Sequence, residues 1–190
     1  MIRWVVGLGN PGAEYSDTRH NVGFDVLDAL VASEGLNWKR HFAWPAWSAT
    51  WRMEDGHKVV LVKPRTFMNR SGKVLLKALR RGVLADEILV VYDDIDLPCG
   101  GLRLRAGGGG GGHNGVQSVT DALGTAQFPR LRVGIGPRPK GEKLVEYVLG
   151  HWSEEQKMAQ ETVRPRAVSA VKTAVTESVE RAMNEFNRAA

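Results

Sequence analysis

Hydrophobic residues recur along the chain with two periods, one typical of strands and the other of helices. The apolar run at 2–8 predicts a buried strand. Apolar residues within 22–31 recur every three or four positions, which predicts an amphipathic helix. Between 47 and 53 apolar and polar residues alternate, and the Asp-Gly pair at 55–56 predicts a tight turn into a second strand at 57–63.

The rest of the chain continues this mixture of strands and helices. Strand patterns occupy 87–92, 102–106 and 131–135, and helical patterns occupy 71–81, 116–123 and 141–149. A capping box at Ser153-Glu154-Glu155-Gln156 opens a last helical region. Pro165 is expected to interrupt that region and to leave a final helix with an apolar face over 168–186.

Strands that alternate with helices predict an α/β fold. We expect one domain over 1–190, because a chain of 190 residues suits a single hydrophobic core. The expected architecture is a three-layer sandwich with a central mixed, mostly parallel twisted sheet flanked by helices. The C-terminal helices of 153–187 are expected to pack on it.

Composition and hydropathy indicate the cellular compartment of the protein. Cys99 is the only cysteine, which excludes an internal disulfide and a thiolate-rich zinc site. No apolar run approaches the ~18–20 residues of a membrane-spanning helix, and the N-terminus shows no signal-peptide pattern. We therefore expect a cytoplasmic protein with no membrane partner.

Charge is distributed in blocks. Lys and Arg outnumber Asp and Glu by 26 to 21. Residues 63–81 are basic and lack acidic residues, 82–102 are acidic and lack basic ones, and 103–143 are again mostly basic. Ordinary solvated helix faces would explain these blocks, and so would a footprint for RNA phosphates on both sides of an acidic strand end.

Five polar residues stand where predicted strands or loops give way to the next element. They are Asn10, His20, Asn69, Asp93 and Asn114. In an α/β fold such positions gather at the carboxyl edge of the sheet, where ligands bind. A carboxylate can hold one ring N–H of a histidine, and the other ring nitrogen can then take a proton from water. We therefore expect a hydrolase that activates water with His20 and Asp93.

Other chemistries remain open at this point. Gly7-x-Gly9-x-x-Gly12 formally matches a dinucleotide-binding fingerprint, although no helix opens within its glycines. The carboxylates of Asp93, Asp94 and Asp96 could bind Mg²⁺. Each asparagine of the set could instead cap a helix or a turn.

Two further segments have alternative interpretations. The glycine run 107–112 allows backbone N–H groups to approach an anion, but it could equally be a plain connector. The four tryptophans within 38–51 could stack on bases if they are exposed. Their alternation in a predicted strand favours packing in the core.

Several ordered sequence blocks resemble bacterial peptidyl-tRNA hydrolases. In chain order the blocks are Val6-Gly-Leu-Gly-Asn-Pro-Gly, Tyr15-x-x-Thr-Arg-His-Asn-x-Gly-Phe, Lys63-Pro-x-Thr-Phe-Met-Asn-x-Ser-Gly, Asp93-Asp-Ile-Asp-Leu-Pro, Gly111-Gly-His-Asn-Gly and Arg130-Leu-Arg-Val-Gly-Ile-Gly. The resemblance implies an esterase, without metal or other cofactor, that frees tRNA from peptidyl-tRNA after aborted translation. It also implies a monomer that requires no protein partner.

The resemblance assigns a role to each matching residue. His20 would be the general base, and Asp93 would orient it. Residues implied to bind the peptide end, the attacking water or the ester are Asn10, Asn69 and Asn114, and those implied to line the site are Tyr15, Phe67, Met68 and His113. Arg105 and Arg132 would face the 5′ phosphate of the tRNA. Arginine at 105 keeps the charge of the lysine found in some relatives.

Two rival functions belong to other classes. An RNA-binding protein on the same fold could have lost hydrolysis, as related plant organelle splicing factors have, although the intact His20, Asp93 and asparagines favour an enzyme. A nucleotide-dependent oxidoreductase is the more distant rival, and it rests on the glycine fingerprint alone.

Overall fold

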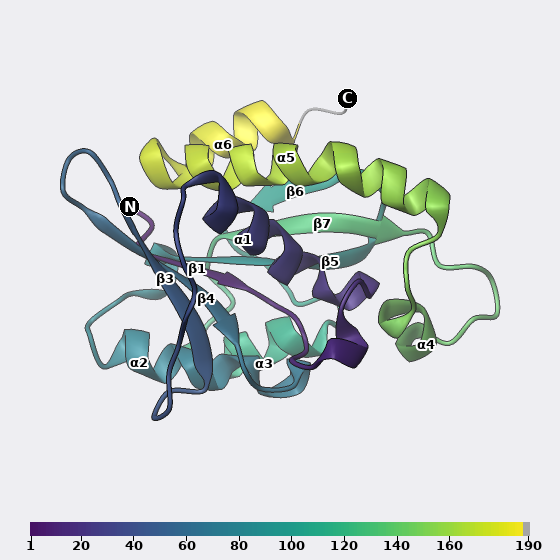
Figure 1. Cartoon of the computed structure of the whole chain (residues 1–190), viewed down its shortest axis with the longest axis horizontal. Helices are drawn as coiled ribbons and strands as arrows, with labels where there is room; N and C mark the ends of the chain where they lie inside the picture. The colour runs from purple at the N-terminus through teal and green to yellow at the C-terminus, as the bar shows by residue number, and fades with distance from the viewer. Residues whose placement is uncertain (188–190) are drawn as a thin grey trace.

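A seven-stranded sheet separates two layers of helices in the computed structural model, which describes residues 1–187 (Figure 1). The strands in chain order are β1 (Trp4–Gly7), β2 (Lys39–Arg40), β3 (Ala46–Arg52), β4 (Lys58–Pro64), β5 (Ile88–Pro98), β6 (Leu102–Arg105) and β7 (Arg130–Gly136).

The sheet is mixed, with a parallel centre and antiparallel edges. Its strand order is β2-β3-β4-β1-β5-β7-β6, and the four strands from β4 to β7 run parallel. At the two edges β2, β3 and β6 pair antiparallel with their neighbours. The central strands are apolar on both faces because helices cover both sides. The expected fold class is therefore confirmed.

Helices cover both faces of the sheet. The α-helices are α1 (Val22–Ser33), α2 (Leu76–Leu79), α3 (Asn114–Leu123), α4 (Leu144–Leu149), α5 (Glu154–Thr176) and α6 (Val179–Phe186). The 3₁₀ helices are η1 (Ala13–Tyr15), η2 (Arg19–Asn21), η3 (Met68–Leu75) and η4 (Ala85–Glu87).

Two hydrophobic cores lie on opposite faces of the sheet. One joins the sheet to α1, α5 and α6, and the other joins it to η3, α2 and α3. Two of the four tryptophans expected to pack, Trp44 and Trp51, are buried, while Trp38 and Trp47 are half-buried. No helix within residues 1–187 is both long and apolar enough to cross a membrane.

A close approach between β1 and α1 sets the position of the segment before the helix. A Cβ atom on Gly7 would lie 2.3 Å from the carbonyl oxygen of Gly23, so the two elements touch only because residue 7 lacks a side chain. This contact brings η2, which carries His20, beside the carboxyl end of β1.

The expected interruption at Pro165 is wrong. The helix α5 runs unbroken through this proline to Thr176. A proline removes one helical hydrogen bond, but Val163, Ala167 and neighbouring residues are buried against the sheet, and this packing outweighs the loss. The break falls instead before α6, where the Ser178 side chain accepts the backbone N–H of Arg181.

Two further expectations need correction. The segment 71–81 is mainly the 3₁₀ helix η3, and only Leu76–Leu79 is α-helical. There, the N–H of Gly72 donates to the Ser118 hydroxyl of α3, and α3 lies so near that a Cβ on Gly72 would clash with it. The strand expected at 87–92 continues to Pro98, so Asp93 lies within β5 and not at its end.

Candidate active site

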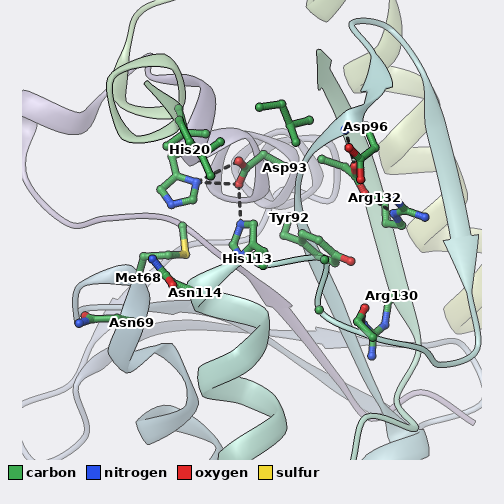
Figure 2. Close-up of a pocket in the computed structure, with 18 of the residues that line it drawn as sticks. His20, Met68, Asn69, Tyr92, Asp93, Asp96, His113, Asn114, Arg130 and Arg132 are labelled. Carbon is green, nitrogen blue, oxygen red and sulfur yellow. Dashed lines mark hydrogen bonds and ion pairs between the residues drawn. The ribbon is translucent and has the colours of Figure 1, made fainter. Parts of the chain in front are cut away.

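A cavity of about 570 Å³ opens at the carboxyl edge of the parallel strands (Figure 2). Asn10 follows β1, Met68 and Asn69 follow β4, and Asp93 comes from β5. The starts of two helical segments contribute His20 and Asn114 to the same wall. Six residues scattered over 105 positions of sequence thus meet at one site.

His20 and Asp93 are in direct contact. The Nδ1 atom of His20 lies 2.9 Å from each carboxylate oxygen of Asp93, so the ring N–H donates to the carboxylate. The other ring nitrogen, Nε2, points away from Asp93 (Figure 2). The His20 side chain is 12% exposed and lines the cavity.

A second imidazole contacts the same carboxylate. The Nε2 atom of His113 lies 2.9 Å from Oδ1 of Asp93. The other nitrogen of His113 caps α3 by accepting the backbone N–H groups of Gly115 and Val116, at 3.1 and 3.2 Å. His113 therefore carries its proton on Nε2 and donates it to Asp93. Asp93 receives hydrogen bonds from two rings.

These contacts shift two pKa values. Burial alone raises the pKa of Asp93, but the adjacent His20 and His113 outweigh burial and hold that pKa well below its usual range. Burial lowers the pKa of His20, and the Asp93 carboxylate overcomes this effect and raises it above 6.5. Asp93 is accordingly ionised at neutral pH, and it stabilises a proton on His20.

Asn10 is held rigidly with one donor left over. Its backbone exchanges two hydrogen bonds with the side chain of Asn21, at 2.8 and 3.0 Å. Its side-chain oxygen accepts the backbone N–H of Met68 at 2.8 Å. Among residues 1–187 nothing accepts from its Nδ2 group, which is therefore a fixed donor on the cavity wall.

Met68, the first residue of η3, packs against the start of α3. It is buried, and a Cβ on Gly115 would lie 2.4 Å from its sulfur atom. Residue 115 must therefore be glycine for α3 to start this close to the site. The contact fixes His113 and Asn114 relative to the end of β4.

The outer wall is exposed and carries free amides. Asn69 and Asn114 are exposed, and Phe67 is 56% exposed. Tyr15 packs edge-on against Phe67, with 6.2 Å between ring centroids. Within the described part of the chain neither amide has a hydrogen-bond partner, so both are available to a ligand.

The two arginines expected at phosphate lie on neighbouring strands of the far edge. Arg105 ends β6 and is exposed, while Arg132 lies on β7; both line the cavity. Arg132 donates its Nε–H to the carboxylate of Asp94. This ion pair fixes the guanidinium by one side, and its terminal nitrogens are left for another acceptor.

The glycine loop is anchored by a buried arginine. The guanidinium of Arg130, whose residue is only 1% exposed, donates to the carbonyl of Gly109 at 2.9 Å and to that of Ala126 at 2.7 Å. It also stacks on Phe128, 4.2 Å from the ring centroid. One end of the loop 107–112 is thereby held beside the cavity.

Helix α4 supplies an apolar wall opposite the amides. This wall consists of Leu144, Val145, Val148 and Leu149. Arg19, the neighbour of His20, connects η2 to this helix by donating to the carbonyl of Tyr147 at 3.0 Å and to the side chain of Gln156 at 2.8 Å. The C-terminal third of the chain therefore helps to hold the histidine segment.

The donor set does not fit a metal ion. His20, Asp93 and His113 bring three possible ligand atoms within 4.8 Å of one another. However, the nitrogens that face Asp93 carry protons, because His113 uses its other nitrogen as an acceptor. A metal ligand needs a deprotonated nitrogen. The carboxylates considered for Mg²⁺ also have separate partners, since Asp94 pairs with Arg132 while Asp93 contacts His20 and His113.

Sequence reasoning assigned no role to several residues that shape the site. They are Asn21, Arg130 and the apolar residues of α4, while Asp94, considered only as a Mg²⁺ ligand, pairs instead with Arg132. Asn21 and Asp94 directly follow His20 and Asp93, and this adjacency to a candidate residue could have indicated that they belong to the site. Nothing in the sequence indicates that Arg130 points inward.

Fold and site together define the class: a three-layer α/β protein whose cavity holds a paired histidine and aspartate, His20 and Asp93. The family model for peptidyl-tRNA hydrolase matches residues 4–190. The chain therefore belongs to the peptidyl-tRNA hydrolase family, and the resemblance read from its sequence blocks is confirmed.

Individual relatives match over nearly the whole chain. The peptidyl-tRNA hydrolase of Aquifex aeolicus is 47% identical over 189 residues, which cover 98% of this chain and 97% of the relative. That of Symbiobacterium thermophilum is 45% identical and covers 98% and 100%. A crystal structure of peptidyl-tRNA hydrolase from Acinetobacter baumannii superposes with a TM-score of 0.91 at 36% identity, covering 98% of this chain and 94% of that one.

Proposed function

We propose that this protein hydrolyses the ester that joins a peptide to the 3′ ribose of tRNA, with His20 as general base and Asp93 as its orienting partner. The observation that carries the proposal is the His20–Asp93 contact inside a cavity lined by free amide donors. Family membership supports the same substrate.

The first step is the attack of water on the ester carbonyl. Because Asp93 holds the Nδ1 proton of His20, the lone pair of Nε2 is available to take a proton from water. Asp93 then stabilises the imidazolium that forms. The Asp93 carboxylate raises the pKa of His20, which makes the ring a stronger base for the proton of the attacking water.

The second requirement is stabilisation of the tetrahedral oxyanion. The Nδ2 group of Asn10 and the amides of Asn69 and Asn114 are the donors that the wall offers. One preorganised donor of this kind contributes ~2.7–4 kcal/mol to transition-state stabilisation. When the intermediate collapses, the His20 imidazolium returns its proton to the departing ribose oxygen.

The tRNA itself is bound mainly through its phosphates. Arg105 and Arg132 lie at the β6 edge of the cavity, where they can meet the 5′ phosphate. Contacts of this type carry little sequence information, which suits an enzyme that accepts many tRNAs. One chain supplies every residue named, so we propose a cytoplasmic monomer that needs no metal, cofactor or protein partner.

The decisive experiment measures peptide release from an N-blocked aminoacyl-tRNA in the presence of a chelator. We expect the wild type to release the peptide, and His20→Ala to lose activity while it retains tRNA binding. His151→Ala is the matched control, since this exposed histidine lies outside the cavity. Binding of tRNA without release by the wild type would reject hydrolysis and support the RNA-binding rival.

A further inference from the structure

A basic surface covers the edge of the molecule opposite to Arg105 and Arg132. Its side chains come from β2, from the loop 41–45 and from the segment 65–81. We call it the α2 surface, and its members are Lys39, Arg40, Phe42, Arg65, Arg70, Lys73, Lys77, Arg80 and Arg81. All of them are exposed or half-exposed.

The positive charges on η3 and α2 form a stripe. Arg70 and Lys73 are separated by one turn of 3₁₀ helix, so they lie above one another. Lys77 lies on α2 four residues after Lys73, and Arg81 follows at the same interval, two residues beyond the end of α2. From helical rises the row from Arg70 to Arg81 is roughly 20 Å long, which is enough for several phosphates of one strand.

These charges have no internal counter-charges. Within residues 1–187, no carboxylate lies within 4.0 Å of any basic group of the α2 surface. Partial burial lowers the pKa of Lys77, and the positive charges of Arg81 and Lys39 lower it further. Like charges have thus been collected where they repel one another, and a polyanion would relieve that repulsion.

The loop 41–45 is anchored next to this stripe. Trp44 is buried, its indole N–H donates to the carbonyl of Val74 at 3.0 Å, and the Nζ atom of Lys77 lies 4.0 Å from its ring centroid. Arg65 donates to the carbonyl of His41 at 2.9 Å. Figure 1 shows the loop at the end of β3 on the same side of the sheet as α2.

Phe42 projects from this anchored loop. Its side chain is 97% exposed, the highest value among the large hydrophobic residues. An aromatic ring held in water among unpaired arginines and lysines is the arrangement that single-stranded nucleic acids use, with bases stacked on the ring and phosphates on the cations. A membrane surface would require an amphipathic helix much longer than the four residues of α2.

The α2 surface is separate from the arginines assigned to the substrate. Strand β2, which carries Lys39 and Arg40, is the first and β6 the last in a sheet of seven strands, so six strand spacings of ~4.8 Å place these two residues roughly 29 Å from the edge that carries Arg105. An acceptor stem that contacts Arg105 and Arg132 lies on the other side of the cavity.

We propose that the α2 surface is a second RNA-binding site, which takes a single-stranded RNA segment distinct from the acceptor stem of the substrate. The basic stripe holds the phosphates, and an unpaired base stacks on Phe42. The site is independent of hydrolysis and goes beyond the function proposed above.

The test is binding of a labelled, unstructured 12-nucleotide RNA to the full chain at low and high salt. We expect Lys73→Glu/Arg80→Glu to weaken binding at least tenfold at low salt and to flatten its salt dependence. Phe42→Ala is expected to weaken binding about tenfold through lost stacking. Arg52→Glu/Lys58→Glu is the matched control, because these exposed charges lie at the opposite end of β3 and β4.

Three measurements decide the outcome. Loss of oligonucleotide binding in the two α2-surface variants, with kcat/KM for peptide release unchanged, supports the site. Wild-type affinity in both variants overturns it. So does capture of the protein by phosphatidylserine vesicles that depends on the same residues while the RNA remains unbound, since that result assigns the surface to a membrane. Peptide release is assayed separately, so failure here leaves the hydrolase proposal standing.

Discussion

The side chains of the inner wall of the cavity are fixed by hydrogen bonds, whereas those of the outer wall are free. On the inner wall Asp93, His20, His113 and Asn10 are buried or nearly so, and each is fixed by at least two hydrogen bonds or by a helix cap. On the outer wall Asn69, Asn114 and Arg105 are exposed and have no partner within residues 1–187. The polar groups of the inner wall find their partners when the chain folds, while those of the outer wall are left for a ligand.

The difference separates two kinds of catalytic contribution. A preorganised carboxylate–imidazole pair needs no rearrangement when charge develops, so its effect falls on kcat. Exposed amides and cations lose rotamer freedom when they bind, so their contribution to recognition and to oxyanion stabilisation is reduced by an entropic cost. Substitutions on the inner wall should therefore change turnover and stability together, and those on the outer wall should leave stability unchanged.

The largest effect is expected from Asp93→Asn. An amide of the same size cannot accept both imidazole N–H groups, so His20 loses its tautomer and its electrostatic support. We expect kcat to fall about a thousandfold to ten-thousandfold, with a lowered Tm. Steady-state peptide release and thermal unfolding measure both quantities. Asp96→Asn, an exposed carboxylate of the same cavity, is the control, and an equal loss there would contradict a specific role for Asp93.

A smaller effect is expected from Asn114→Ala on the outer wall. Loss of one donor to the oxyanion should lower kcat about a hundredfold, and Tm should stay within error because the amide has no partner in the folded protein. Gln117→Ala, one turn further along α3, provides a control outside the cavity. A large drop in Tm for Asn114→Ala would show that the two walls are not separable.

The pH profile tests the inner wall without any substitution. His20 acts as a base only when it is neutral, and Asp93 raises the pKa of its conjugate acid. We therefore expect log(kcat/KM) to rise with unit slope, about tenfold per pH unit, and to level off above pH 6.5. An inflection below 6.5 would mean that the desolvation of His20 outweighs the carboxylate.

The smallest effect is expected from Arg105→Ala. The loss of one exposed cation should raise KM by a few fold at low salt and reduce the slope of log KM against log salt by about one, with kcat unchanged. The pair Arg132 and Asp94 offers a comparison, because Arg132→Ala also leaves a buried carboxylate unpaired and should lower Tm. Equal salt slopes in the wild type and in Arg105→Ala would remove this arginine from the phosphate site.

Periodicity predicted most of the fold, and contacts between distant segments account for the failures. The strand and helix at the N-terminus and the hairpin around Asp55 obey local rules. By contrast, Pro165 is tolerated and η3 is tightened by packing against the sheet and α3, which no local pattern reports. Residues at the ends of strands were placed well, because all parallel strands share one carboxyl edge.

The sequence predicted some contacts of the site but not others. The sequence placed His20 after the first expected strand and Asp93 at the end of the strand expected at 87–92, which indicated that they would meet, although Asp93 in fact lies within β5. The second imidazole on Asp93 was not predictable, since His113 acts through the capping geometry of α3. The inward direction of Arg130 depends on carbonyls from two separate loops, so it required the structure.

The connection from Arg19 to Tyr147 and Gln156 has a consequence for biosynthesis. While it is being made, every protein is itself a peptide esterified to tRNA. In this protein His20 is made before the residues that hold its segment, since Tyr147 lies 128 residues after Arg19, and β7 must also join the sheet. The unfinished chain therefore lacks an assembled site. A chain that stops before Tyr147 and Gln156 lacks the contacts that hold the His20 segment to α4 and α5.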